Sequence, residues 1–331
     1  MEHLDVWLKF LLGAGVIVIA GTGLTRSADR LSRALGWGHA FAGFVILGWA
    51  TSLPEVTISV SAVLKEQSAG LSSGNISGSI IFNLAILAIL DLIALRRGVH
   101  STSNSTGLAT LAVFNLLMLS LALGQAFYPD FNRGETAPFI GIFLVTLYLA
   151  ATLTSWQMER QQDKKDAPPS EPIARHAGAC LTLGAVILLA GVFLSTVGDQ
   201  IAQAYQLQDS LVGTIFLATV SSLPEYVTGL AAVRLGLHAL AAGSILGSNV
   251  FNLGILGVCD LLFLKGPGAG EGMIAVVMAQ TPLRLAGNLT AGLLMTVLAL
   301  FAVRAKTRSA WQVLPLLSLG IYLTALFGGG S

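Results

Sequence analysis

TSLPE at residues 51–55 and SSLPE at residues 221–225 are two copies of one motif, and this repetition decides the predicted fold. Two further matches follow in the same order and at almost the same separation: GSIIFN (78–83) with GSNVFN (247–252), and DL (91–92) with DL (260–261). Three ordered matches with one residue of slippage are hard to obtain by chance. The sequence therefore indicates an internal duplication whose most similar parts are polar.

The composition indicates a polytopic membrane protein. Of 331 residues, 54% are hydrophobic and only 11% are charged, and the mean hydropathy is +0.77. Soluble domains carry about 25% charged residues. This deficit excludes an ordinary cytosolic enzyme, a disordered protein and a disulfide-stapled secreted domain. The net charge of +1 gives no nucleic-acid footprint, and Cys180 and Cys259 lie in apolar runs that support no disulfide framework.

Ten apolar runs reach the roughly 20 residues that a helix needs to cross a hydrocarbon core of about 30 Å. They cover residues 6–25, 40–64, 73–95, 106–127, 137–156, 177–198, 211–235, 239–264, 285–304 and 311–328. The stretch 266–284 holds Pro267, Pro282 and four glycines, which predicts a loop with an interfacial piece and leaves open an extra half-span.

The polar segment 157–175 divides these spans five and five, into residues 1–156 and 176–331. With an odd number of spans in each half, the second copy must enter the membrane from the opposite side. Inverted repeats that meet near the bilayer midplane are typical of secondary transporters. The predicted fold class is therefore an all-α polytopic membrane protein with ten transmembrane helices in two inverted five-helix repeats.

The basic residues predict the orientation of the chain. If the N-terminus is outside, the cytoplasmic loops, including the linker 157–175, hold 13 of the 18 lysines and arginines. This excess follows the positive-inside rule. We therefore expect a multi-pass protein of the plasma (inner) membrane with both termini on the extracellular or periplasmic side.

Four of the 17 acidic residues lie inside apolar runs, namely Glu55, Asp91, Glu225 and Asp260. A carboxylate in the bilayer interior costs at least a few kcal/mol and normally faces a cavity, a partner or an ion. Glu55 and Glu225 lie mid-span, and inverted symmetry brings them to similar depth. Since no lysine or arginine lies mid-span, protons or cations must balance their charge; two protonated, purely structural glutamates are the alternative. Asp91 and Asp260 lie near a membrane face, where snorkelling or capping is expected.

Each of the two glutamates follows a proline. Pro54 and Pro224 cannot donate to the carbonyls of Ala50 and Val220, so both helices are predicted to break or kink at the central ion site. Carbonyls freed at membrane depth need another partner, which a cation can supply. Neighbouring hydroxyls and amides add further oxygens: Thr51, Ser52, Ser221, Ser222, Ser79, Ser248, Asn83 and Asn252. An all-oxygen set suits Ca²⁺, whereas zinc or copper would require a Cys/His cluster.

Two pairs of glycines four residues apart lie on the spans that carry these asparagines. They are Gly74 with Gly78, and Gly243 with Gly247. Small residues at this spacing let helix backbones approach closely. We therefore expect these glycines to serve packing.

The motifs resemble the two alpha-repeat signatures of the cation/calcium antiporter superfamily, most closely the compact prokaryotic-type sodium/calcium exchangers. The first signature spans residues 48–83 and the second 218–252. The resemblance implies a central site in which Glu55 and Glu225 are shared by Ca²⁺ and Na⁺. It further implies that the six hydroxyls named above are ligands, joined by the carbonyls of Gly48 and Ala218, with Asn83 and Asn252 between the ions. It also implies that spans one and six slide to switch access.

The sequence departs from this pattern at several positions. Ala50 and Val220 replace the glycine usual before the hydroxyl pair, Ser221 replaces a threonine, and Ile80 replaces a common asparagine. The position of Asn252 is aspartate in several branches, including potassium-dependent ones. Asparagine there disfavours obligatory potassium co-transport.

These features predict an antiporter, not an enzyme, that exports Ca²⁺ using the Na⁺ gradient. It would work without a cofactor, as a monomer in the lipid bilayer. An empty site would hold two negative charges in a poorly hydrated interior, so only the loaded forms should switch between the two sides. Three alternatives stay open: H⁺/Ca²⁺ or K⁺-assisted exchange, a cation channel with the glutamates as a filter, and an intramembrane enzyme.

Overall fold

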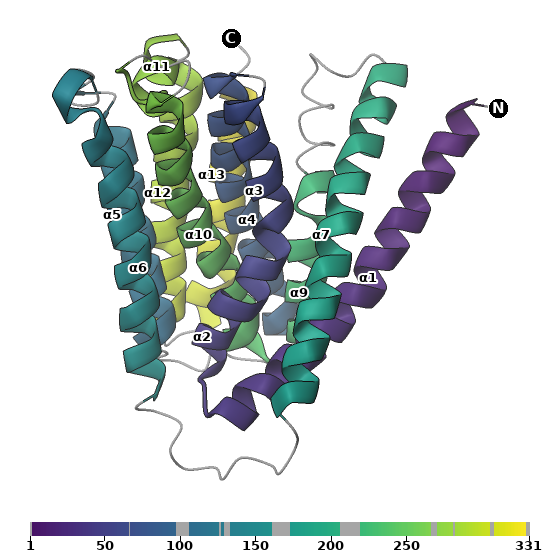
Figure 1. Ribbon diagram of the computed structural model, residues 1–331. Coiled ribbons are helices and arrows are strands. Elements are labelled where there is room, and N and C mark those ends of the chain that lie inside the picture. The colour runs from purple at the N-terminus through teal and green to yellow at the C-terminus, as the bar shows by residue number, and fades with distance from the viewer. Residues whose placement is uncertain are drawn as a thin grey trace.

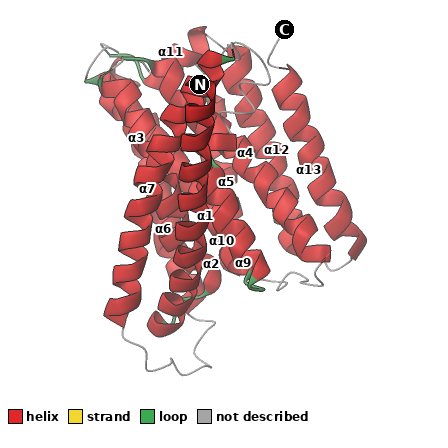
Figure 2. Ribbon diagram, turned by 90° about the vertical axis from the view of Figure 1, so that its right-hand side faces the viewer, coloured by secondary structure: helices red, strands yellow, loops and turns green. Residues whose placement is uncertain are grey.

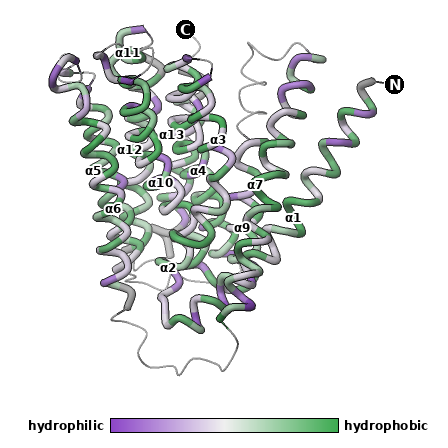
Figure 3. The backbone as a smooth tube through the Cα atoms, viewed as in Figure 1, coloured by the Kyte–Doolittle hydropathy of each residue, from purple (hydrophilic) through white to green (hydrophobic). Residues whose placement is uncertain are grey.

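The computed structural model describes residues 2–65, 67–96, 106–125, 127–128, 133–160, 173–205, 219–265, 270–280, 282–304 and 308–328. In these ranges the chain forms a bundle of helices, with one isolated bridge between Arg133 and Glu271 (Figures 1 and 2). The start of α1 and the end of α13 lie at the same end of the bundle. Hydrophobic residues cover the middle of the helices, and hydrophilic ones gather toward the two ends (Figure 3).

The helices of the first half are α1 (Glu2–Leu35), α2 (His39–Ala42), the π-helix η1 (Gly43–Gly48), α3 (Trp49–Leu64), α4 (Ala69–Arg96), α5 (Thr106–Gly124), the 3₁₀ turn η3 (Gly134–Thr136) and α6 (Pro138–Arg160). Those of the second half are α7 (Ile173–Ala204), α9 (Leu223–Arg234), α10 (His238–Leu264), α11 (Met273–Gln280), α12 (Pro282–Arg304) and α13 (Arg308–Gly328). Residues 161–172 of the expected linker lie outside the described ranges.

Eight described helical segments are long and apolar enough to cross a membrane. They are Leu4–Leu35, His39–Leu64, Ala69–Arg96, Thr106–Gly124, Gly134–Met158, Ile173–Ala204, His238–Leu264 and Leu285–Val303. Each matches one of the ten predicted spans. The predicted span 211–235 is described only from Thr219, and the apolar helix Gln312–Ala325 in α13 is shorter. An all-helical, multi-pass membrane protein is thus confirmed, whereas the count of ten and the inversion stay predictions.

Within the stretch 266–284, Met273–Gln280 form the short, largely buried helix α11, which is consistent with the interfacial piece or half-span expected there. A buried carboxylate explains why a helix can begin here. Oδ1 of Asp260, at the end of α10, accepts a hydrogen bond from the backbone N–H of Ile274 at 3.1 Å. The first N–H groups of a helix have no intrahelical acceptor, so this contact satisfies one of them. Capping was the expected role of Asp260, and the structure confirms it.

The two signature prolines have different surroundings. In the second half, Pro224 lies at the start of α9, and Ser222 leaves helical geometry with φ −95° and ψ 16°, which confirms the expected break. In the first half the helix does not break at Pro54, because α3 runs through the proline, and the alternative of a kink stays a prediction. The irregularity instead lies just upstream, in the π-helix η1. Local π adjustments let transmembrane helices retain a proline.

α4 and α10 form the centre of the bundle, and α1 and α7 form its flank. In α4 and α10, 72% of the most apolar window is buried, compared with 22% in α1 and 28% in α7. α1 packs mainly along α7 and also contacts α9, while α3 contacts α7. Figure 1 shows α1 and α7 side by side at one edge of the bundle. The signature helices therefore lie between this pair and the core.

Two glycines of α10 allow the backbone of α2 and η1 to approach closely. A Cβ atom at Gly243 would lie 2.3 Å from the carbonyl oxygen of Ala40, and one at Gly247 would lie 2.6 Å from Cα of Phe44. The packing role expected for this pair is confirmed. Around Gly74 and Gly78 no described atom lies within 4 Å of such a Cβ, so the same expectation is not met by the described residues.

Candidate cation-binding site

The structure brings the two mid-span glutamates together inside the bundle. Glu55 lies on α3 and is 1% exposed, and Glu225 lies in the first turn of α9 and is fully buried. They are close enough for their charges to interact. Among the described residues, neither forms an ion pair with a lysine, arginine or histidine. Two acids from the two halves of the chain thus share one buried region without a protein cation.

A hydrogen bond between the halves holds one of these carboxylates. The hydroxyl of Ser52 donates to Oε1 of Glu225 at 3.2 Å, which joins α3 to α9. Both carboxylate oxygens of Glu55 and Oε2 of Glu225 are buried and have no hydrogen-bond partner among the described residues, and the same holds for the hydroxyl of Ser222. Burying an unpaired polar or charged group is costly. These oxygens therefore require a proton or a cation as partner.

A second contact between the halves lies one turn before Ser52. The hydroxyl of Ser248 on α10 donates to the carbonyl oxygen of Gly48 at 3.3 Å. The hydroxyl of Thr51 donates to the carbonyl oxygen of Leu47 at 3.0 Å and approaches that of Gly48 at 3.5 Å. The carbonyl expected as a ligand in the first half thus already accepts a hydrogen bond from the second half. Because the hydroxyl of Thr51 also approaches this carbonyl, a cation that binds to it would have to replace one of these contacts.

Asn83 on α4 and Asn252 on α10 are both 1% exposed. Nδ2 of Asn83 donates to Oδ1 of Asn249 at 3.1 Å, while Oδ1 of Asn83 has no partner. Neither amide atom of Asn252 has a partner. Two buried amide oxygens are therefore available to a cation.

Of the three remaining expected ligands, two lie among the described residues. Ser79 is buried on α4, and Ser221 lies in the short helical turn before Ser222, in contact with its surroundings. Ala218 lies outside the described residues.

Sequence reasoning missed three polar residues near the site. Asn75 of α4 donates through Nδ2 to the hydroxyl of Ser59 at 2.8 Å and to the carbonyl oxygen of Glu55 at 3.3 Å. Ser59 lies four residues after Glu55, on the same helix face, so its spacing could have identified it. Asn249 faces α4 and donates to the carbonyl oxygen of Ile80 at 3.1 Å. The sequence did contain a signal for Asn249, because the two copies of the repeat differ there and the first copy has isoleucine, Ile80, at the corresponding position.

The other acids inside apolar runs have partners elsewhere. Oδ1 of Asp91 lies 2.7 Å from Nε2 of His238, and both residues are buried. Asp260 caps α11, as described above. No group of three or more histidine, cysteine, aspartate or glutamate side chains that could hold a metal exists within the described part of the chain. The candidate site is therefore two carboxylates with neutral oxygens, a donor set suited to hard cations such as Ca²⁺ and Na⁺.

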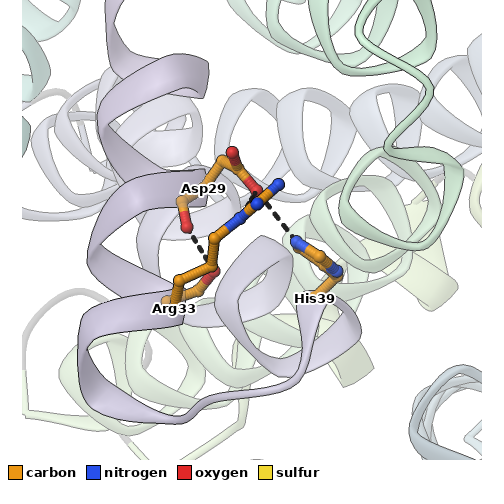
Figure 4. Close-up of polar contacts among 4 residues, drawn as sticks. Asp29, Arg33 and His39 are labelled. Carbon is orange, nitrogen blue, oxygen red and sulfur yellow. Dashed lines mark hydrogen bonds and ion pairs between the residues drawn. The ribbon is translucent and has the colours of Figure 1, made fainter. Parts of the chain in front are cut away.

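A polar contact at the end of α1 connects the flank to the first signature. Oδ1 of Asp29 accepts hydrogen bonds from Nε of Arg33 at 3.1 Å and from Nε2 of His39 at 2.9 Å (Figure 4). His39 begins α2, which leads through η1 to Gly48 and Glu55. α1 is thus tied at this end to the segment that carries the site.

Comparison with known proteins agrees with this arrangement. A family model described as sodium/calcium exchanger protein matches residues 6–157 and 176–328. Inner membrane protein YrbG of Escherichia coli is 32% identical over 78% of this chain and 79% of that protein. The putative antiporter CaxA of Alkalimonas amylolytica is 30% identical, covering 82% and 86%. The sodium/calcium exchanger MaX1 of Methanosarcina acetivorans is 24% identical, covering 78% and 83%.

Solved structures show the same fold. The sodium-calcium exchanger NCX_Mj, soaked with 2.5 mM Na⁺ and 10 mM Sr²⁺, superposes with a TM-score of 0.74 at 20% identity. The match covers 98% of each chain. At this level of identity the likeness establishes the architecture of the helices.

Proposed function

The chain belongs to the sodium/calcium exchanger family, and we propose that it exports Ca²⁺ from the cell in exchange for entering Na⁺. The family makes it a membrane antiporter for cations. One observation carries the proposal of the site: two buried glutamates, one from each half, have three carboxylate oxygens with no hydrogen-bond partner in the described ranges. MaX1, a relative by sequence, is named a sodium/calcium exchanger, which supports Na⁺ as the counter-ion.

In this proposal the glutamates are the central ligands. Glu55 and Glu225 bind Ca²⁺ or Na⁺ in turn, with the hydroxyls of Thr51, Ser52, Ser221, Ser222, Ser79 and Ser248, the carbonyls of Gly48 and Ala218, and the amides of Asn83 and Asn252 as neutral ligands. Neutral oxygens fit because they complete the coordination of a hard cation without adding charge. One Ca²⁺ or two Na⁺ then cancels the two negative charges.

Charge balance explains the coupling. An unloaded site would carry two carboxylates through a region where no described lysine or arginine compensates them. Charge in a poorly hydrated interior is costly, so the empty form resists the switch between the two sides. In the loaded forms the charge of the site is neutralised, so these forms can switch between the two sides of the membrane. Exchange follows because each crossing must carry ions.

We further propose ten spans in two inverted repeats, with both termini outside and the 157–175 linker in the cytoplasm. α1 and α7 would then be the moving pair. Their contacts with the signature helices support this, because each passes over a signature helix at a glycine. Gly191 of α7 faces the ring of Pro54, and Gly21 of α1 faces Val227 on α9, at positions 170 residues apart.

The test is Ca²⁺ flux into proteoliposomes with Na⁺, K⁺ and H⁺ gradients imposed one at a time. We expect Na⁺ alone to drive uptake, and Glu55→Gln and Glu225→Gln each to lower the rate at least about 100-fold, since each leaves the ion with half of its anionic ligands. Glu135→Gln, in the exposed turn η3, is the matched control and should transport normally. Near-normal flux in either buried variant would contradict the proposal.

H⁺/Ca²⁺ exchange is the second candidate, because buried carboxylates without partners bind protons as well as cations. Uptake driven by a pH gradient without Na⁺ would establish it. A requirement for K⁺ would indicate K⁺-assisted exchange instead. Flux far above carrier rates without a counter-ion would indicate a channel.

A further inference from the structure

We propose that Asn249 is a positioning residue, which fixes the side-chain amide of Asn83 so that its oxygen is available to the transported cation. The inference rests on the proposed function, because it concerns a neutral ligand of the same site. Asn249 itself is not proposed as a ligand. Its role follows from two hydrogen bonds that connect α10 to α4.

The first bond determines the orientation of the Asn249 amide. Nδ2 of Asn249 lies 3.1 Å from the backbone carbonyl oxygen of Ile80. A carbonyl oxygen can only accept, so the group that faces it must be the NH₂ end of the amide. The flipped amide would place two oxygens in contact without a hydrogen between them. The backbone of α4 thus sets which end of Asn249 points where.

The second bond transmits this orientation to Asn83. Since the nitrogen of Asn249 is held by Ile80, its oxygen Oδ1 is the atom that meets Asn83, at 3.1 Å. An oxygen requires a donor, so Asn83 must present its own NH₂ end there. Oδ1 of Asn83 is left on the other side of the amide. It is buried and has no hydrogen-bond partner within the part of the chain that the structure describes.

In the second half of the chain no corresponding residue orients the asparagine. Asn252 occupies the position that corresponds to Asn83, and the residue that corresponds to Asn249 is Ile80, which has no side-chain amide. Neither Nδ2 nor Oδ1 of Asn252 has a partner among the described residues. Within those residues, the amide of Asn83 is therefore oriented before the ion arrives and that of Asn252 is not.

Orientation matters because the two ends of an amide have opposite effects on a cation. The oxygen coordinates Na⁺ or Ca²⁺, whereas the NH₂ group repels it. A ligand already held in its binding orientation loses less freedom on binding, which raises affinity. Without Asn249, the NH₂ group of Asn83 would be buried without an acceptor and would compete for the same space as the oxygen.

The experiment compares Asn249→Ile, which places the residue of the first copy in the second, with Asn83→Ala and with the double variant. In proteoliposomes, the half-saturating Na⁺ and Ca²⁺ concentrations are measured separately from the maximal rate. We expect Asn249→Ile to raise at least one half-saturating concentration about tenfold, with a maximal rate within about twofold of the unaltered protein. In the Asn83→Ala background the same substitution should add nothing, because Asn249 acts through Asn83.

Asn288→Ala is the matched control, because Asn288 of α12 also donates to a side chain of α4, the hydroxyl of Ser77, at 3.2 Å. It should leave both concentrations unchanged. Asn249→Ala serves if the larger isoleucine impairs folding. Unchanged half-saturation in both Asn249 variants, or losses that add in the double variant, would overturn the inference. Absence of Na⁺-driven flux in the unaltered protein would instead refute the proposed function.

Discussion

In the first copy of the signature both carboxylate oxygens of Glu55 lack a hydrogen-bond partner among the described residues, whereas in the second copy Oε1 of Glu225 accepts a hydrogen bond from Ser52. The corresponding serine, Ser222, does not return the contact and has an unpartnered hydroxyl. Asn83 is likewise held by Asn249, while Asn252 is not held. The duplication therefore gives both copies the same kinds of ligand side chain. The residues around each copy determine which of these side chains are held by hydrogen bonds.

The supporting helices differ in the same way. In the second copy Gly243 and Gly247 of α10 meet the backbone of α2 and η1, whereas Gly74 and Gly78 of α4 meet no described atom. The segment that would correspond to η1 in the second copy is residues 213–218, outside the described ranges. The comparison between the copies can be tested at three levels: packing, carboxylate contacts and amide orientation.

The largest effect is expected from Gly243→Val. Even its Cβ atom would lie 2.3 Å from the carbonyl oxygen of Ala40, so α2 and α10 would have to separate, at a cost of about 3 kcal/mol or more. Gly74→Val should cost far less if the described residues are its only neighbours. Thermal stability in detergent, followed by size-exclusion chromatography, measures both. An equal loss at Gly74 would show that the segment before Thr219 packs there and that the copies are packed alike.

A smaller effect is expected from the serines beside the glutamates. Ser52→Ala removes the hydrogen bond to Glu225 and should raise the half-saturating Ca²⁺ concentration about tenfold, since hydrogen bonds to charged groups are among the stronger ones. Ser222→Ala removes a hydroxyl that has no partner among the described residues, and it should change the half-saturating Ca²⁺ concentration less. Flux titrations of the two variants measure the difference. Equal effects would mean that the ion-loaded site is symmetric.

The smallest effect is expected from exchanging the amide between the copies. In the Ile80→Asn/Asn249→Ile double variant, the new amide on α4 would face the carbonyl of residue 249 and orient Asn252 instead of Asn83. We expect half-saturating concentrations to return to within about threefold of the unaltered protein. The same flux titrations apply. A double variant no better than Asn249→Ile alone would show that the two asparagines are not interchangeable.

Much of this arrangement could be predicted from the sequence, because polar residues are rare in apolar spans and each must be compensated. The meeting of Glu55 and Glu225 followed from the repeat, and the presence of hydroxyls beside them followed from the two motifs. The packing role of Gly243 and Gly247 followed from their spacing. These predictions depend on composition and period, which a single sequence contains.

The remaining features depend on contacts between distant segments. The helix α11 forms in a stretch whose prolines and glycines predicted a loop with an interfacial piece or a half-span, and the buried carboxylate of Asp260 satisfies its first turn. The π-helix η1 lies just before α3, which continues through Pro54, and the sequence carries no pattern that predicts it. The role of Asn249 depends on which carbonyl of α4 it meets. No local pattern encodes such partners.

The helix α1 is longer than the hydrocarbon core of a membrane is thick. Its 34 residues span about 50 Å, well beyond a hydrocarbon core of about 30 Å, and Figure 1 shows it leaning away from the bundle. Only 22% of its most apolar window is buried, so much of its surface is free to contact acyl chains. A helix longer than the hydrocarbon core is accommodated by tilting or by a local change in the bilayer, at a cost of fractions of a kcal/mol per Å. A change in bilayer thickness therefore acts on the helix that Asp29 and His39 join to the segment that carries the site.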